Sequence, residues 1–175
     1  MSTGTIEDTL GFTYDGSLPT SVSWKGPVNG NVSVTYNNDF RVTSQSVNGG
    51  NTVNYTYDDD GLLTQAGALS LYHEPVNGRL TGTGLGNVTT NYNYTAYGEL
   101  SSYSAKYSGS DVFSSSYVLD DIGRITQLTE TVSGQTHVFD YQYDLSGRLW
   151  KVEHNDTLIS EYFYDDNGNR IFYIS

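Results

Sequence analysis

The sequence YQYDLSGRL at residues 141–149 recurs, with small changes, as YFYDDNGNRI at residues 162–171. The second tyrosine and the aspartate of this phrase, Tyr143 and Asp144, return 21 residues later as Tyr164 and Asp165. A short phrase that returns at a near-constant interval indicates a repeat architecture in which every copy is one small supersecondary unit.

Weaker copies occur along the whole chain, aligned on the glycine and on the aliphatic residue two places after it. They are FTYDGSL at 12–18, VTYNNDFRV at 34–42, YTYDDDGLL at 55–63, HEPVNGRL at 73–80, YNYTAYGEL at 92–100 and YVLDDIGRI at 117–125. The position equivalent to Tyr143 falls at residues 14, 36, 57, 74, 94, 119, 143 and 164, so the chain contains eight units with variable spacing. Such variation is typical of fixed hairpins joined by loops of different length.

Each phrase predicts one β-hairpin. Two tyrosines separated by one residue place both rings on the same face of a strand, because side chains alternate along it. The aspartate suits the first corner of a type I turn, where its carboxylate accepts backbone N–H bonds, and the glycine supplies a positive φ. The segment Arg148–Val152 then returns as the second strand.

A second set of turns, for example at residues 48–50, 133–134 and 155–156, joins one hairpin to the next. Eight units of two strands predict an antiparallel meander of roughly 14 to 16 short strands. No window carries a helical apolar period. The expected fold class is therefore all-β, with hairpins forming an open, curved, single-layer sheet strip, and a β-sandwich is the alternative. We expect a lead-in at residues 1–11 and the hairpin array at residues 12–175.

Composition favours the single layer and excludes several functions. Sixteen tyrosines stand against six phenylalanines and two tryptophans, so burial depends on rings that carry a hydroxyl. The net charge of −12 argues against nucleic acid and anionic membranes as partners. The lack of cysteine excludes disulfides and thiolate metal sites. No apolar run is long enough to span a membrane, and the first residues do not read as a signal peptide.

The phrase Tyr-x-Tyr-Asp-x-x-Gly-Arg-Leu, fullest at residues 141–149, resembles the tyrosine-aspartate (YD) repeat of the Rhs family, which also occurs in insecticidal toxin-complex shell proteins and in teneurins. The resemblance extends from about Phe12 to Ile171. It implies a β-strip that spirals into a hollow shell, which encloses a carboxy-terminal toxin in bacterial members and forms a scaffold of cell-surface receptors in teneurins.

The chain departs from this family pattern in two ways. Eight units are too few to close a shell, so we expect a segment of a longer array whose open edges favour self-association. The Asp-Pro-x-Gly-type signature that ends the bacterial core is missing, so neither an autoproteolytic site nor a toxin domain is carried over.

The candidate site residues are those of the phrase, in a structural role. They are Tyr14, Asp15, Tyr36, Arg41, Tyr55, Tyr57, Asp58, Gly61, Gly78, Arg79, Tyr92, Tyr94, Gly98, Tyr117, Asp120, Gly123, Arg124, Tyr141, Tyr143, Asp144, Gly147, Arg148, Tyr162, Tyr164, Asp165, Gly168 and Arg170. All five arginines stand at the position that Arg148 holds in the fullest phrase, the arginine position, or one place beyond it. One interpretation is a row of cations for acidic sugars. The favoured one places each arginine on a neighbouring tyrosine ring and pairs it with a turn aspartate.

Other chemistry has less support. The acidic turns at 58–61 and 165–169 offer the oxygen ligands that Ca²⁺ prefers, but they lack the spacing of a calcium loop. His73, His137 and His154 form no spaced metal-binding pair. A pair of carboxylates that cleaves a glycoside has no sequence signature and stays an alternative. We expect no catalytic residue, no cofactor and no metal.

The main hypothesis is a non-enzymatic structural module of a secreted or cell-surface shell. Its partners would be further repeats, from the same chain or from another copy, and an enclosed carboxy-terminal cargo. The alternative hypothesis is an extracellular module that binds carbohydrate or protein through exposed tyrosines. The two differ in a testable way, because substitution of a tyrosine in the sheet would change stability, whereas substitution of a sugar-binding tyrosine would change affinity.

Overall fold

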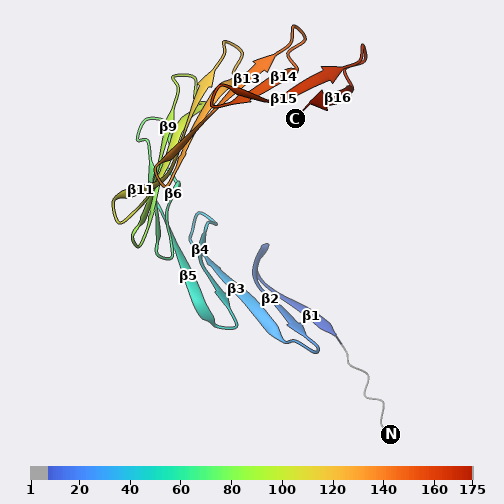
Figure 1. Cartoon of the computed structure of the whole chain (residues 1–175). Helices are drawn as coiled ribbons and strands as arrows, with labels where there is room; N and C mark the ends of the chain where they lie inside the picture. The colour runs from blue at the N-terminus through green and yellow to red at the C-terminus, as the bar shows by residue number, and fades with distance from the viewer. Residues whose placement is uncertain (1–7, 175) are drawn as a thin grey trace. The chain divides into compact units, whose positions relative to one another are not determined.

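The structure is a computed structural model that describes residues 8–174, and these residues form sixteen β-strands (Figure 1). The same residues contain no helix, and hence none that could cross a membrane. The chain divides into two compact units, Met1–His73 and Glu74–Ser175. The predicted lead-in falls largely on residues 1–7, which lie outside the described residues, and strand β1 begins at Thr9. The division of the chain at residues 11 and 12 stays a prediction.

The first unit is an antiparallel meander whose strands pair in chain order. They are β1 (Thr9–Asp15), β2 (Leu18–Lys25), β3 (Gly30–Tyr36), β4 (Val42–Val47), β5 (Gly50–Tyr57), β6 (Leu63–Ala66) and β7 (Leu69–His73). Most of the phrase turns in this unit introduce a register shift, as between Thr56 and Tyr57, because the positive φ of the glycine position adds a bulge to the hairpin.

The second unit continues the same pattern. Its strands are β8 (Leu80–Leu85), β9 (Val88–Tyr94), β10 (Leu100–Tyr107), β11 (Ser110–Leu119), β12 (Ile125–Val132), β13 (Gln135–Tyr143), β14 (Leu149–His154), β15 (Thr157–Tyr164) and β16 (Arg170–Ile174). The sixteen strands confirm the predicted all-β meander and its strand number.

The turns that join one hairpin to the next are also confirmed. At 48–49, 133–134 and 155–156 both central residues have positive φ, which defines the type I′ turn that matches the twist of two-residue hairpins. Asn155 and Asp156, for example, have φ of 47° and 62°. Asparagine, aspartate and glycine tolerate this conformation better than other residues, which explains their use here.

Each unit is a single layer. Within either unit only consecutive strands contact one another, so neither holds a second sheet, and the β-sandwich alternative is wrong for both. Among the residues that the structure describes, Val152 is the only buried hydrophobic side chain. Stability must therefore come from strand pairing and from side-chain contacts along the sheet rather than from an enclosed core.

The two faces of the layer differ. The paired tyrosines of a phrase lie on one face, and the residue between them lies on the other, because side chains alternate. On that second face, hydroxyls bond across the hairpins: the Oγ1 atoms of Thr35 and Thr43 are 2.8 Å apart, and those of Thr56 and Thr64 are 3.0 Å apart. The layer thus carries the paired tyrosines on one face, the aromatic face, and at these hairpins it carries hydroxyl pairs on the second face. In the last hairpin the second face carries Phe163 and Phe172 instead, with ring centroids 5.6 Å apart.

Candidate functional site

The turn of a phrase is built around the side chain at its aspartate position, as Asp144 shows. The Asp144 Oδ1 atom accepts hydrogen bonds from the backbone N–H groups of Ser146 and Arg148, both at 2.9 Å, and Oδ2 accepts one from Arg148 Nε at 2.7 Å. The Gly147 N–H donates to the Asp144 carbonyl, and Gly147 has a φ of 79°. This is the predicted turn, with the aspartate at its first corner and the glycine at positive φ.

These donors lower the pKa of the turn carboxylates. The pKa of Asp144 is lowered mainly by the backbone N–H of Arg148 and then by the guanidinium of Arg148. Arg124 lowers the pKa of Asp120 in the same way. The pKa of Asp165 is lowered first by the side-chain amide of Asn169 and then by its backbone N–H. Hydrogen bonds to the ionised form favour it, so the turns are best held when these carboxylates are charged.

Three turns depart from the pattern. In the first phrase Gly16 directly follows Asp15, and Asp15 pairs with Leu18, so this turn is shorter. Phe40 occupies the glycine position of its phrase with a φ of 61°, a conformation that costs a non-glycine residue about 1–2 kcal/mol. The turn from Glu74 to Arg79 is one residue longer than the turn of the full phrase, because Gly78 N–H donates four residues back to the Glu74 carbonyl, whereas Gly147 N–H donates three residues back to Asp144. Glu74 therefore stands at the aspartate position. The predicted equivalence of residue 74 to Tyr143 is wrong by one place, and His73 holds that position.

The second tyrosine of a phrase joins the repeat unit of that phrase, one hairpin, to the preceding repeat unit. Its hydroxyl donates to the carbonyl that follows the preceding arginine, as from Tyr164 to Leu149 at 2.7 Å. Arg148 lies over the same ring, with Cζ 4.5 Å from the centroid. We refer to this arrangement as the arginine–tyrosine junction. It also joins Arg41 to Tyr57, Arg79 to Tyr94 and Arg124 to Tyr143, at 5.7, 5.6 and 4.3 Å.

The glycine makes room for this junction. A Cβ atom on Gly98 would lie 2.6 Å from Nη2 and 2.9 Å from Cζ of Arg79, which is closer than real Cβ atoms approach their neighbours. A Cβ on Gly61 would collide with the guanidinium of Arg41 in the same way. At Gly61 and Gly98 glycine is therefore required twice, once for its positive φ and once for the close approach of an arginine from the preceding hairpin, whereas a Cβ on Gly168 would lie 3.7 Å from Arg148 Nη1, an ordinary contact.

At two contacts between successive hairpins, other residues occupy both the arginine position and the position of the second tyrosine. Glu99 holds the arginine position before Leu119, and Leu62 holds it before His73. Tyr36 follows a unit without an arginine, and its hydroxyl still donates to the Pro19 carbonyl at 2.8 Å. Every arginine that stands at the arginine position thus has a tyrosine in the next unit, whereas the tyrosine can occur without it.

The remaining phrase residues take equivalent places. Tyr14, Tyr55, Tyr92, Tyr117, Tyr141 and Tyr162 lie on strands, Asp15 ends β1, Asp58 begins a turn, and Gly78, Gly123 and Gly168 have positive φ. Burial is the largest cause of a raised pKa at Tyr141, followed by the nearby charge of Glu130. Arg170 begins β16 one place beyond the arginine position and lies over Tyr162 and Tyr173, at 5.6 and 5.9 Å. Asn169 holds the arginine position of this phrase, and its side-chain amide donates to Asp165 Oδ2 at 3.1 Å.

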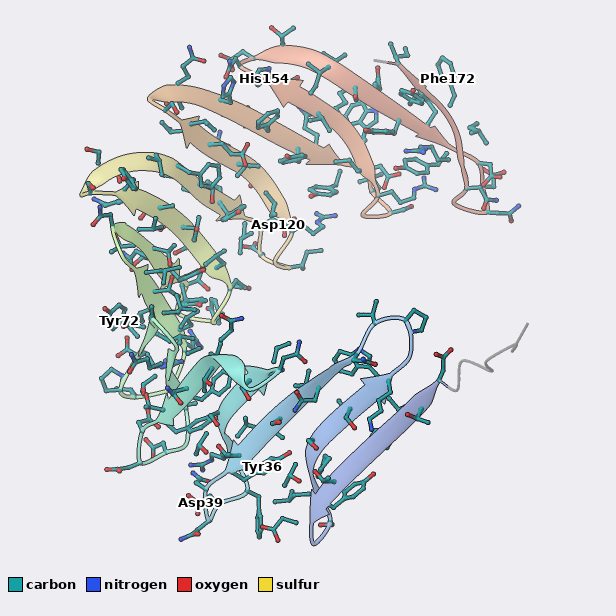
Figure 2. The ribbon with its side chains drawn as sticks, turned by 90° about the horizontal axis from the view of Figure 1, so that it is seen from below. Tyr36, Asp39, Tyr72, Asp120, His154 and Phe172 are labelled. Atoms are coloured by element: carbon teal, nitrogen blue, oxygen red, sulfur yellow. The ribbon has the colours of Figure 1, made fainter. Side chains whose placement is uncertain are left out.

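Two arrangements are missing from the sequence prediction. His137 and His154, the latter labelled in Figure 2, lie on adjacent strands, with His137 Nδ1 3.0 Å from His154 Nε2. The His154 ring stacks on the Phe139 ring, with centroids 4.7 Å apart. Asn155 also receives the backbone N–H of Val138 on its Oδ1 at 2.9 Å. Both contacts join residues 17 apart across a strand pair, so only the register of the sheet could have indicated them.

Metal ligands do not gather on the sheet. Within residues 8–174, no group of three or more histidine, aspartate or glutamate side chains is placed to hold a metal ion. In the turns at Asp120 and Asp144, the carboxylate oxygens already accept backbone and arginine donors.

Comparisons with known proteins agree with this geometry. The family profile described as teneurin YD-shell matches residues 1–174. Teneurin-4 of Homo sapiens is 29% identical over 156 residues, which cover 83% of this chain and 5% of that protein. Teneurin-3 of Danio rerio is 28% identical over 155 residues, covering 82% of this chain and 6% of that protein. The chain thus spans about a twentieth of the length of these relatives.

Solved structures share the fold. The Tc holotoxin pore of Photorhabdus luminescens, carrying a TccC3 mutation, matches with a TM-score of 0.72 at 15% identity, covering 87% of this chain and 10% of that chain. The TcdB2–TccC3 complex matches with a TM-score of 0.60 at 13% identity, covering 84% of this chain and 12% of that chain.

Proposed function

Because the chain belongs to the teneurin YD-shell family, we propose that it is a non-enzymatic structural module, a strip of hairpins that forms part of the wall of a larger shell or cell-surface scaffold. Its partners are further YD repeats and a cargo domain enclosed by the wall. Its place is outside the cell, in a secreted or cell-surface protein. In this role the chain supplies a surface rather than a reaction.

The arginine–tyrosine junction is the observation that carries this proposal. Each junction attaches one unit to the next through a hydroxyl–carbonyl hydrogen bond and a cation over a ring. A neutral hydrogen bond contributes about 0.5–1.5 kcal/mol and an exposed cation–π contact about 0.5–1 kcal/mol. A strip held by such local contacts can be extended by adding units and needs no core, which is the property a wall requires.

The phrase residues have structural roles in this proposal. The tyrosines and arginines join neighbouring units, the aspartates hold the turns, and the glycines admit the arginines. The aromatic face differs in chemistry from the second face, which carries hydroxyl pairs at several hairpins, and this difference suits a wall that separates an enclosed volume from the outside.

Tyrosine substitutions test this role. Tyr143→Phe removes the hydroxyl that bonds the Ile125 carbonyl, so the free energy of unfolding should fall by about 0.5–1.5 kcal/mol. Tyr97→Phe is the matched control, because Tyr97 is 90% exposed in a turn and should leave stability unchanged. Urea denaturation measures both. Equal stability of the two variants, together with loss of glycan binding on an array in either of them, would contradict the structural role and support a binding module.

The coding sequence on both sides of this chain tests enclosure. A wall segment requires many further YD phrases, and a cargo requires an unrelated domain after them. Flanking sequence without YD phrases would exclude a shell built from one continuous polypeptide.

A further inference from the structure

The first and last strands carry exposed apolar side chains. Within the described residues β1 pairs only with β2, and β16 pairs only with β15. On β16 the exposed fractions range from 64% for Ile171 to 50% for Ile174, and Phe172, labelled in Figure 2, is 56% exposed. On β1, Leu10, Phe12 and Tyr14 are 53–62% exposed. Unpaired edges of this kind are templates for pairing with another strand.

A constant register links the units. The residue three places after the arginine position pairs with the residue three places before the second tyrosine. The pairs are Ser44 with Asn54, Gln65 with Ser70, Gly82 with Asn91, Ser102 with Ser116, Gln127 with Asp140 and Lys151 with Glu161. In the first phrase the turn is shorter and Tyr14 pairs with Pro19, which puts Leu18 at the arginine position, so Ser21 with Ser33 follows the same rule. The tyrosine hydroxyl then reaches the carbonyl that follows the arginine position, as Tyr36, Tyr57, Tyr94, Tyr143 and Tyr164 all do.

This register can be applied to the two edges. On β16 the arginine position is Asn169, and on β1 the second tyrosine is Tyr14. The rule places Phe172 opposite Gly11 of a second chain, so a large ring faces a residue without a side chain. It also places the Tyr14 hydroxyl at the Arg170 carbonyl. Among the described residues the Tyr14 hydroxyl makes no hydrogen bond, in contrast to the five tyrosines that hold the same position.

The side chains on the aromatic face are also complementary. The same register places Ile171 opposite Phe12 and Tyr173 opposite Leu10. All four are at least half exposed in the isolated chain. Apolar pairs directly opposite each other stabilise neighbouring strands. By contrast, pairing β16 with another β16 would leave Tyr14 and its apolar neighbours in solvent.

We propose that β16 of one copy pairs with β1 of a second copy, antiparallel and in the register of the internal junctions. The proposal rests on the wall function, because it extends the strip across two chains. A head-to-tail contact leaves the opposite edge of each copy free to pair again, so the copies form assemblies whose size rises with concentration. The interface is short and each chain carries a net charge of −12, so association is weak, and it is tighter in physiological salt than in low salt.

Two edge-blocking variants test the geometry. Lysine is a natural guard of sheet edges, so Phe12→Lys blocks the β1 edge and Ile171→Lys blocks the β16 edge. Analytical ultracentrifugation should show each variant alone as a monomer and an equimolar mixture as a one-to-one dimer, while the unchanged chain forms longer species. Dimers of Phe12→Lys alone would overturn the proposal in favour of β16 pairing with itself. An unchanged chain that stays monomeric up to about 1 mM, the weak end of specific binding, would also overturn it.

A pair of tyrosine variants separates this proposal from the wall function. Tyr14→Phe should weaken association about threefold to tenfold, the effect of one neutral hydrogen bond, and leave chain stability unchanged. Tyr36→Phe makes the same change at an internal junction, so it should lower the urea midpoint and leave association unchanged. Unchanged association of Tyr14→Phe refutes the intermolecular register alone. An unchanged urea midpoint of Tyr36→Phe refutes the structural role of the phrase tyrosines.

Discussion

Two glycines of the second unit allow the contribution of one arginine to be measured. Gly98 and Gly109 both have positive φ, of 97° and 83°, and lie in consecutive turns at the two ends of β10. A Cβ on Gly98 would meet Arg79, whereas a Cβ on Gly109 would meet no atom within 4 Å. Gly98→Ala and Gly109→Ala therefore both strain the backbone, but only Gly98→Ala also brings a Cβ against an arginine.

The expected magnitudes follow from these contacts. A non-glycine residue at positive φ costs about 1–2 kcal/mol, and the reduced freedom of the unfolded chain returns about 0.4–1 kcal/mol. Gly109→Ala should therefore destabilise by about 1 kcal/mol. Gly98→Ala should cost about 0.5–1 kcal/mol more, because the guanidinium must leave the Tyr94 ring, from which Cζ is now 5.6 Å away.

Urea denaturation of both variants should be repeated in an Arg79→Gln background. Glutamine ends where the arginine Nε lies and so lacks the atoms that the new Cβ would meet. The excess cost of Gly98→Ala should then disappear, while the cost of Gly109→Ala should persist. Equal costs in the original background, or an excess that survives Arg79→Gln, would refute the reasoning that the glycine admits the arginine.

Three further outcomes are expected. Phe40→Gly should stabilise the chain by about 0.5–1 kcal/mol because glycine relieves the positive φ, whereas Phe40→Ala should not; thermal denaturation compares them. Glu99→Arg and Leu119→Tyr together should restore an arginine–tyrosine junction and stabilise by about 0.5–1 kcal/mol more than the sum of the single changes, measured as a double-mutant cycle in urea. Stability should be constant above about pH 5 and fall as acid protonates turn carboxylates through their lowered pKa values, because a lowered pKa stabilises the folded state only while the group is ionised. The turn carboxylates with lowered pKa values are those of Asp120, Asp144 and Asp165. When all three are replaced by asparagine, the residue that holds the aspartate position at Asn37, urea denaturation should show a smaller loss of stability between pH 5.5 and pH 3.

The sequence was sufficient for the hairpins but not for the contacts between them. Turn chemistry is local, so Asp144 and Gly147 could be assigned from spacing alone. The phrase at residues 73–80 contains one additional residue between Glu74 and Gly78, so counting back from the glycine gives residue 74 where the structure places His73. The placement of Arg148 on the ring of the next unit, and the meeting of His137 with His154, depend on strand register, which is set by the whole sheet.

The arginines support the structural interpretation because of what they accompany. A row of cations for acidic sugars would need no particular residue in the following unit. Yet each arginine at the arginine position precedes a tyrosine that it covers, and where Glu99 replaces it the tyrosine is also replaced, by Leu119. Arg170 lies one place further and covers rings of its own hairpin instead. The arginine is therefore best explained by the tyrosine it meets, and its loss should weaken the attachment of two units rather than the binding of a ligand.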